Sequence, residues 1–311
     1  MIKVDLITGF LGSGKTTFLK KYAKHFIDQG QRIGILENDY GAVNVDMLLL
    51  NDLRGDNCEL EMVAGGCDAD CHKRRFKTKL IAMGMSGYDR VIIEPSGVFD
   101  VDEFFDSLHD EPLDRWYEIG NVITVVDARL EDNLSADSDF FLASQIANAG
   151  VIVLSRTQLT DAAHISATKE HLKRACTAAK LDKNVDAITF EKAWNDLTDD
   201  DFEKLSSCGY TTNSYIKKIT TDDSGYKTVY FLELPVKLDG LKEKINALMT
   251  EERFGKVLRA KGFFKDNDTW YQFNATKNDF DLTEMPVGQE VFIVIGEELN
   301  QEAIQAHLQL Q

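Results

Sequence analysis

The sequence predicts an α/β fold: a mainly parallel sheet flanked by helices, followed by a smaller α+β domain. Three observations predict it. Through the first two thirds of the chain, apolar β-branched segments alternate with helix-like segments, which is typical of parallel strands joined by helices. A glycine-rich loop separates the first such strand from the first helix. Near residue 210 the alternation ends and a more polar stretch begins.

The glycine-rich loop, residues 9–16, reads GFLGSGKT. Glycine, four residues and Gly-Lys-Thr form a Walker A phosphate loop, and the strand before it and the helix after it supply the required context. The glycines allow backbone conformations that place amides around a polyphosphate. We expect Lys15 to reach the β- and γ-phosphates and Thr16 to bind Mg²⁺. The first domain is therefore predicted to be a P-loop NTPase.

The remaining elements follow in order. Further strands are predicted at residues 31–37, 88–94, 121–127 and 150–154, and helices at 78–85, 102–108, 139–147 and 161–179. The second domain is predicted to hold strands at 226–234, 270–273 and 291–295 and helices at 238–249 and 301–310. We place the domains at 1–210 and 211–311. The aromatic residues of the second domain are predicted to form its core: Phe254, Phe263, Phe264, Trp270, Tyr271 and Phe273.

Composition narrows the function. Thirty-five basic and 52 acidic residues among 311 give a net charge of −17, which argues against a nucleic-acid surface. We find neither a secretory signal nor an apolar run long enough to span a membrane. Five cysteines, an odd number, favour reduced thiols over a disulfide framework. We therefore expect a cytoplasmic protein without nucleic-acid or membrane partners.

Two acidic residues follow predicted strands near the phosphate loop. Glu94 ends an apolar strand, as in a Walker B motif that holds Mg²⁺, and Gly97 stands where an amide can follow the γ-phosphate. The alternative is an exposed glutamate in a turn. Asp39 follows the second strand and could orient the metal or its waters. It could equally be a turn former, like its neighbours.

Residues 58–75 form the most unusual stretch. Cys67 and Cys71 are four residues apart, with Asp70 and His72 beside the second cysteine. Two thiolates and a carboxylate or imidazole could bind Zn²⁺ or a neighbouring transition metal. The alternative is two ordinary free cysteines near the start of a solvated helix.

The order of these segments resembles the CobW-like GTPases, metal-handling proteins related to the nickel-insertion GTPases of urease and hydrogenase. Eight segments match in family order: TGFLGSGKTT (8–17), LENDYGAVNVD (36–46), GGCDADC (65–71), VIIEPSG (91–97), VITVVDA (122–128), VIVLSRTQL (151–159), VLRAKGFF (257–264) and VFIVIGEELN (291–300). The last two resemble the CobW C-terminal domain.

The resemblance implies a slow, switch-like GTPase that delivers or inserts a transition metal, Zn²⁺ or Co²⁺, or services a metallocofactor in a client metalloprotein or cofactor enzyme. It leaves homodimerisation open. Carried over by position, it implies nucleotide contacts from Gly9, Gly12, Ser13, Gly14, Lys15, Thr16, Thr17, Ser155, Arg156 and Gln158. It implies Mg²⁺ held by Thr16, Asp39 and Glu94, with Gly97 at the γ-phosphate. It implies a transition metal near Cys67 and Cys71, beside which Asp70 and His72 stand as further candidate ligands from their position in the sequence.

The chain departs from the family pattern in three places. The usual Cys-x-Cys-Cys is reduced to Cys67 and Cys71, which hardens the site or removes its metal function. The usual Asn-Lys-x-Asp reads Ser-Arg-Thr-Gln at 155–158, and the neutral Gln158 should weaken guanine selectivity and leaves ATP open. Ala42 stands where the family often has a glutamate. Residues 187–190 are a candidate for the second loop that contacts the guanine base.

Two other functions compete with the metallochaperone. The chain could be a nucleotide-dependent assembly or gating protein for a corrinoid or other metalloenzyme, without its own transition-metal site. It could also be a small-molecule kinase, although the second half resembles the CobW domain rather than a substrate lid.

Overall fold

The computed structural model describes residues 1–39, 46–64, 69–96, 101–213, 226–232, 234, 236–286, 288 and 290–309. The chain divides into two compact units, Met1–Lys218 and Ile219–Gln311. Each unit has its own sheet and its own hydrophobic core. The domain limits predicted from sequence divide the chain a little earlier, at residue 210.

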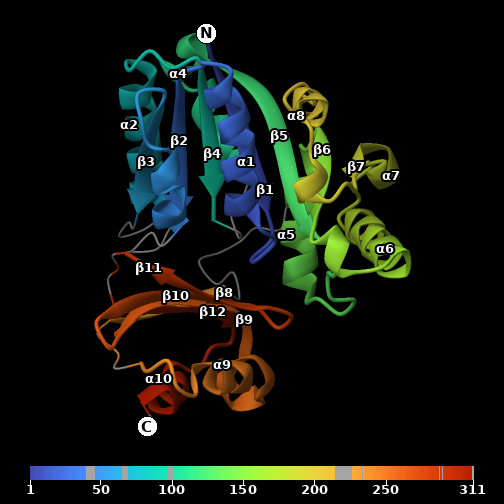
Figure 1. Ribbon diagram of the computed structural model, residues 1–311. Coiled ribbons are helices and arrows are strands. Elements are labelled where there is room, and N and C mark those ends of the chain that lie inside the picture. The colour runs from blue at the N-terminus through green and yellow to red at the C-terminus, as the bar shows by residue number, and fades with distance from the viewer. Residues whose placement is uncertain are drawn as a thin grey trace. The chain divides into compact units, whose positions relative to one another are not determined.

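The first unit is built on seven parallel strands in the order β3-β2-β4-β1-β5-β6-β7 (Figure 1). The strands are β1 Ile2–Gly9, β2 Ile33–Asp39, β3 Cys58–Ala64, β4 Arg90–Pro95, β5 Tyr117–Asp127, β6 Val151–Ser155 and β7 Thr189–Phe190. This confirms the predicted parallel α/β class. Strand β1 is central in the sheet, which explains why all six of its residues from Val4 to Gly9 are buried.

Helices cover both faces of this sheet (Figure 1). They are α1 Lys15–Asp28, α2 Ala69–Gly84, α3 Val101–His109, α4 Leu113–Trp116, α5 Ala136–Ala147, α6 Ala162–Ala178, α7 Val185–Ile188 and α8 Asp199–Leu205. Neighbouring residues of β1 serve opposite cores: Leu6 packs with residues of α2 and α3, whereas Ile7 packs with residues of α1 and α8. The alternation of side chains along a strand therefore separates two hydrophobic layers.

Several elements of the first unit were not predicted, among them β7, α4, α7 and α8. Strand β3 and helix α2 differ for reasons that the structure makes clear. Strand β3 was not expected, but its residues alternate in burial, with Cys58 and Leu60 buried and Glu59 exposed. Helix α2 begins at Ala69 rather than at residue 78. A dense run of charges in its first half hides the buried stripe of His72 and Phe76 that anchors the helix on the sheet.

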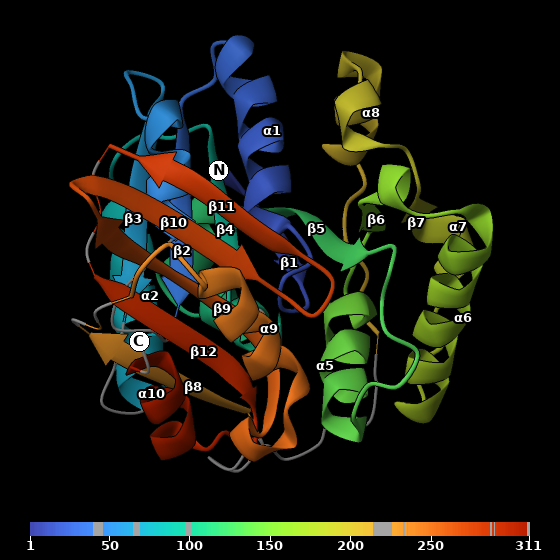
Figure 2. The same cartoon turned by 60° about the horizontal axis from the view of Figure 1, so that its bottom comes forward.

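The second unit is an antiparallel sheet in the order β11-β10-β9-β12-β8, with two helices against one face (Figure 2). The strands are β8 Tyr226–Leu232, β9 Lys256–Asp266, β10 Thr269–Ala275, β11 Phe280–Met285 and β12 Val291–Glu297, and the helices are α9 Leu241–Thr250 and α10 Gln301–Gln309. Phe254, Phe264 and Phe273 lie in its core with Phe292. Strands β9 and β11 were not predicted. In β11 the four central residues are exposed and only one of them, Leu282, is apolar.

Among the described residues, no helix is long and apolar enough to cross a bilayer.

Candidate nucleotide and metal site

The phosphate loop connects the end of β1 to the start of α1. Gly9, Gly12 and Gly14 have φ angles of 147°, 73° and 97°, values that favour glycine. A Cβ on Gly9 would stand 2.2 Å from the carbonyl oxygen of Val125. The glycines of the motif are therefore needed for the loop conformation itself.

Lys15 is the first residue of α1 and is buried. Its Nζ donates a hydrogen bond to the carbonyl oxygen of Gly9 at 3.0 Å. The ammonium is thus held across the loop, close to the glycine-lined backbone. Ser13 is buried beside it, whereas Thr17 is exposed.

The predicted Mg²⁺ ligands of α1 and β4 lie together. The Thr16 hydroxyl donates to Oε1 of Glu94 at 2.9 Å, and both residues are buried. The contact joins residues 78 positions apart, so it depends on the adjacency of β1 and β4 in the sheet. A hydroxyl and a carboxylate are oxygen ligands of the kind that Mg²⁺ prefers. The pair therefore fits the predicted ion.

Glu37 is a site residue that sequence reasoning missed. It lies on β2 directly across from Glu94 in the parallel register, and it is also buried. A glutamate near the carboxyl end of an otherwise apolar strand is the signal that could have identified it. The backbone of Asp39 ends β2, but its side chain lies outside the described residues, as do Gly97 and Ala42.

Arg156 joins the loop after β6, the predicted base loop, to the phosphate loop. Arg156 has a left-handed φ of 57°, and its Nη1 donates to the Gly12 carbonyl at 3.0 Å and to Oδ2 of Asp127 at 2.8 Å. Asp127 also accepts from Arg129 at 3.1 Å. The end of β5 and the loop after β6 are therefore joined to the glycine loop. Gln158, two residues further on, is exposed.

Trp194 follows β7 and was not predicted to belong to the site. Its ring centroid lies 5.5 Å from that of Phe18, and its ring atoms lie 3.3 Å from the place where a Cβ on Gly14 would stand. The Cβ of Ser155 lies 3.8 Å from the same place. The candidate base loop at 187–190 falls on α7 and β7, just before this tryptophan.

Several buried polar atoms around the phosphate loop have no hydrogen-bond partner among the described residues. They are Ser13 Oγ, Ser155 Oγ, Thr157 Oγ1 and Trp194 Nε1. A buried polar atom left without a partner is costly. These atoms come from the phosphate loop, from the predicted base loop at 155–158 and from Trp194, so the site fits a nucleotide.

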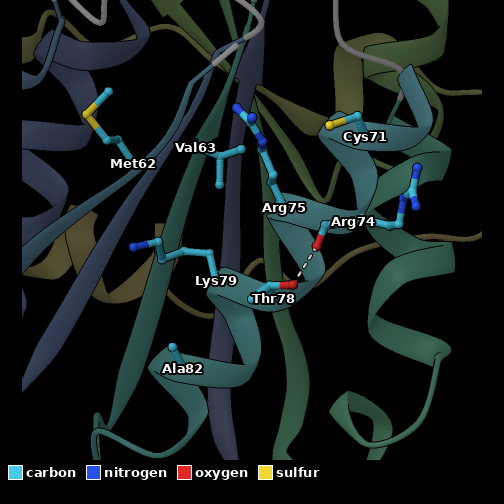
Figure 3. Close-up of a pocket in the computed structure, with 8 residues that line it drawn as sticks. All are labelled: Met62, Val63, Cys71, Arg74, Arg75, Thr78, Lys79 and Ala82. Carbon is cyan, nitrogen blue, oxygen red and sulfur yellow. Dashed lines mark hydrogen bonds between the residues drawn. The ribbon is translucent and has the colours of Figure 1, made fainter. Parts of the chain in front are cut away.

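Cys71 and His72 are neighbours in the sequence but lie in different surroundings. Cys71 is partly exposed and lines a groove of about 660 Å³ beside Val63 (Figure 3). His72 is 1% exposed, and its Nε2 lies 2.8 Å from Oδ1 of Asn38 at the end of β2. Cys67 and the side chain of Asp70 lie outside the described residues.

No cluster of three His, Cys, Asp or Glu side chains that could hold a metal occurs in the part of the chain that the structure describes. Burial raises the pKa values of three other thiols, to about 11 for Cys58 and Cys176 and to about 12 for Cys208. These thiols are poor metal ligands because the thiolate is the form that binds a metal. A transition-metal site built from the described residues would therefore centre on Cys71.

The fold, the phosphate loop and the Thr16–Glu94 pair define a P-loop nucleotide-binding protein. The chain belongs to the CobW-like GTPase family: residues 3–182 match the family model "CobW/HypB/UreG, nucleotide-binding domain", and residues 228–310 match "Cobalamin synthesis protein cobW C-terminal domain". The resemblance seen in the sequence is confirmed, and with it the class of enzyme, a GTPase.

Known proteins of this kind are similar along different lengths. "Zinc-regulated GTPase metalloprotein activator 1" of Schizosaccharomyces pombe is 23% identical, over 97% of this chain and 81% of that protein. "Zinc chaperone YeiR" of Escherichia coli is 32% identical, over 51% of this chain and 48% of that protein, about half of each. The crystal structure of the hydrogenase maturation factor HypB from Archaeoglobus fulgidus is 19% identical, with a TM-score of 0.42, over 66% of this chain and 86% of that one.

Proposed function

We propose that the protein is an Mg²⁺-dependent GTPase that carries a transition metal, of the zinc or cobalt class, to a client metalloprotein. The observation that carries the nucleotide half is the buried Thr16–Glu94 hydrogen bond beneath the phosphate loop. It joins the two motifs that P-loop NTPases use to hold Mg²⁺. The metal half is supported by the names of the relatives, which include zinc chaperones and a zinc-regulated metalloprotein activator.

In hydrolysis, a water molecule attacks the γ-phosphorus of GTP, the bond to the β–γ bridging oxygen breaks, and GDP and phosphate leave. Thr16 and Glu94, with Asp39, would hold the Mg²⁺ that neutralises phosphate charge. Lys15 would exchange its contact with the Gly9 carbonyl for the β- and γ-phosphate oxygens. Arg156 keeps the base loop in register with the phosphate loop. These residues position the nucleotide and stabilise its charge. Among the described residues we identify no general base, so we expect slow turnover.

The cargo would bind at the cysteine segment, with Cys67 and Cys71 as thiolate ligands and Asp70 as an oxygen ligand. His72 is less suited in the described arrangement, because its Nε2 already engages Asn38. Instead, this contact gives the metal segment a route to the nucleotide. Asn38 follows Glu37, which lies in register with Glu94 on the next strand. A shift of β2 on hydrolysis would therefore reach α2 next to Cys71.

A second function is favoured by one observation. The Cys-x-Cys-Cys of the family pattern is reduced to Cys67 and Cys71 in this chain. The chain could then be a nucleotide-dependent assembly or gating protein that serves a corrinoid or other metalloenzyme without binding a transition metal itself. The two functions share the GTPase site and differ in whether metal binding requires the two cysteines.

The GTPase half is tested by Lys15→Ala, assayed as phosphate release from GTP with Mg²⁺. Removing one charge-stabilising donor costs about 3–4 kcal/mol in the transition state, so we expect kcat to fall about 100- to 1000-fold. Lys24→Ala is the matched control, because this lysine lies on the same helix but pairs with exposed Asp28 at 3.0 Å. Hydrolysis by Lys15→Ala at the wild-type rate would contradict the proposed site.

A further inference from the structure

A groove of about 660 Å³ runs between the edge strand β3 and helix α2 of the first unit (Figure 3). β3 is the last strand of its sheet and pairs with β2 on one side. On its other side, the described residues provide no further strand. Met62 and Val63, near the carboxyl end of β3, supply apolar side chains to the groove, and Met62 is 37% exposed.

Helix α2 presents two different stripes. Phe76, Leu80 and Met83 are buried in the core beneath the sheet. Arg74, Arg75 and the residues one and two turns further on line the groove instead, ending at Ala82. From Cys71 to Ala82 the groove stripe extends about 16 Å at 1.5 Å per residue. About five residues of extended chain have this length, so the groove suits an extended segment better than one small anion.

The charge of the groove contrasts with that of the whole chain. The protein carries a net charge of −17, yet α2 contains five basic residues and a single acidic one, Asp70. Three of the basic residues, Arg74, Arg75 and Lys79, line the groove. Lys79 is partly neutralised by Glu61, 2.7 Å away on β3. The groove is therefore a basic patch on an acidic protein, complementary to acidic partners.

We propose that this groove binds an extended acidic segment of a partner protein, which adds as a further strand to the outer edge of β3. Backbone hydrogen bonds to β3 give such a complex its affinity, and the side chains that alternate along the added segment give it specificity. Acidic side chains of the segment face Arg74 and Arg75, and apolar ones cover Met62 and Val63. The inference rests on the proposed function in one respect: Cys71 opens into the same groove, so the partner would dock next to the cargo.

The test uses the full chain and fluorescently labelled peptides of about ten residues, a typical strand length. One peptide alternates glutamate with valine, a second alternates lysine with valine, and a third carries proline at every second acidic position. Anisotropy should show binding of the first peptide only. Lysine reverses the charge, and proline lacks the backbone N–H that a strand needs.

Arg74→Glu with Arg75→Glu should weaken binding of the acidic peptide at least about tenfold, through like-charge repulsion. Ala82→Glu adds one acidic side chain to the groove without removing any contact of the arginines, and it should weaken binding in the same direction. The matched control is Lys180→Glu with Lys204→Glu, two exposed lysines that lie just after α6 and within α8, outside the groove. It should bind the peptide like the wild type.

Equal binding to the groove variants and the control would overturn the proposed surface, and equal binding of the proline peptide would overturn strand addition. GTP hydrolysis and Zn²⁺ binding are measured on the same variants. Loss of peptide binding with both activities intact supports a separate docking surface. If the wild type hydrolyses GTP and binds Zn²⁺ but no peptide, only the docking inference fails. If it binds the peptide but no Zn²⁺, the metal half of the proposed function fails instead.

Discussion

Gln158 is the residue that bears most directly on nucleotide choice. In the family pattern an aspartate at this position accepts hydrogen bonds from guanine, and Gln158 offers a single neutral acceptor. Its neighbour Arg156 keeps the loop attached to the phosphate loop through the Gly12 carbonyl. Arg156 thus keeps this loop beside the phosphate loop, where we propose that it contacts the base. Gln158 is a weaker acceptor for guanine than the aspartate of the family pattern.

Gln158→Asp should restore guanine selectivity. A hydrogen bond to a charged group contributes about 1.5–3 kcal/mol, so the preference for GTP over ATP should rise about ten- to 100-fold. The measurement is competition of GTP and ATP for a fluorescent GDP analogue. Thr160→Asp, at a partly exposed position just past the loop, serves as the charge control. An unchanged GTP-to-ATP ratio in Gln158→Asp would show that the base is read elsewhere.

At the scale of single elements, α8 positions the loop that carries Trp194. Asp201 in its first turn accepts hydrogen bonds from the backbone N–H and hydroxyl of Thr198, at 2.9 and 2.8 Å, and from Lys192. The Lys192 hydrogen bond is the main cause that lowers the pKa of Asp201 to about 2. Thr198 follows Trp194 by four residues, so the cap of α8 also fixes the end of this loop.

Asp201→Asn should therefore destabilise the fold in a pH-dependent way. Because the folded pKa lies below the ordinary value of 3.8, the stabilisation is complete above that pH and is lost as the pH falls towards 2. We expect a loss of about 1–2 kcal/mol near neutral pH. Urea unfolding of wild type and variant should show the two curves converging as the pH is lowered to about 3. A difference that does not depend on pH would contradict the assigned pKa.

The contact between β2 and α2 is the element-scale link in the proposed switch. His72→Phe removes the hydrogen bond to Asn38 and keeps a ring in the buried space, whereas His72→Gln retains a donor that can reach Asn38. We expect His72→Phe to reduce the effect of nucleotide on Zn²⁺ affinity, and His72→Gln to preserve it. Zn²⁺ competition titrations in the two nucleotide states measure this. Full coupling in His72→Phe would exclude this route.

The sequence predicts best what is local. The phosphate loop depends on three glycines within a stretch of eight residues. Its motif therefore predicts both the loop conformation and the binding of phosphate. Glu94 was also predictable, since it ends an apolar strand. Glu37 and Trp194 were not, because their relation to the site depends on the register of β2 with β4 and on packing against Phe18. Strand β3 was not predicted because Glu59 and Glu61 interrupt its apolar residues, and only its edge position in the sheet explains this alternation.

At the scale of the whole molecule, a P-loop unit with a cysteine segment is joined to a second unit with an independent aromatic core. In the first unit, β2 and α2 meet at the Asn38–His72 contact, which lies between the proposed Mg²⁺ ligands and Cys71 in our proposal. If nucleotide state changes metal affinity, linkage requires that metal change nucleotide affinity by the same factor. This reciprocal effect of nucleotide and metal on each other's affinity belongs to the whole molecule and not to any single residue.

The most direct measurement of the central claim is the affinity for Zn²⁺, by competition with a chromophoric chelator, in Mg²⁺ with a non-hydrolysable GTP analogue and in Mg²⁺ with GDP. The account predicts that the two states differ at least about fivefold, and that Cys67→Ala with Cys71→Ala removes both the tight binding and the difference. Equal affinity in the two states, or binding that survives loss of both cysteines, would contradict the metallochaperone switch. Nucleotide binding without any cysteine-dependent metal would instead support the GTPase that assembles a partner protein.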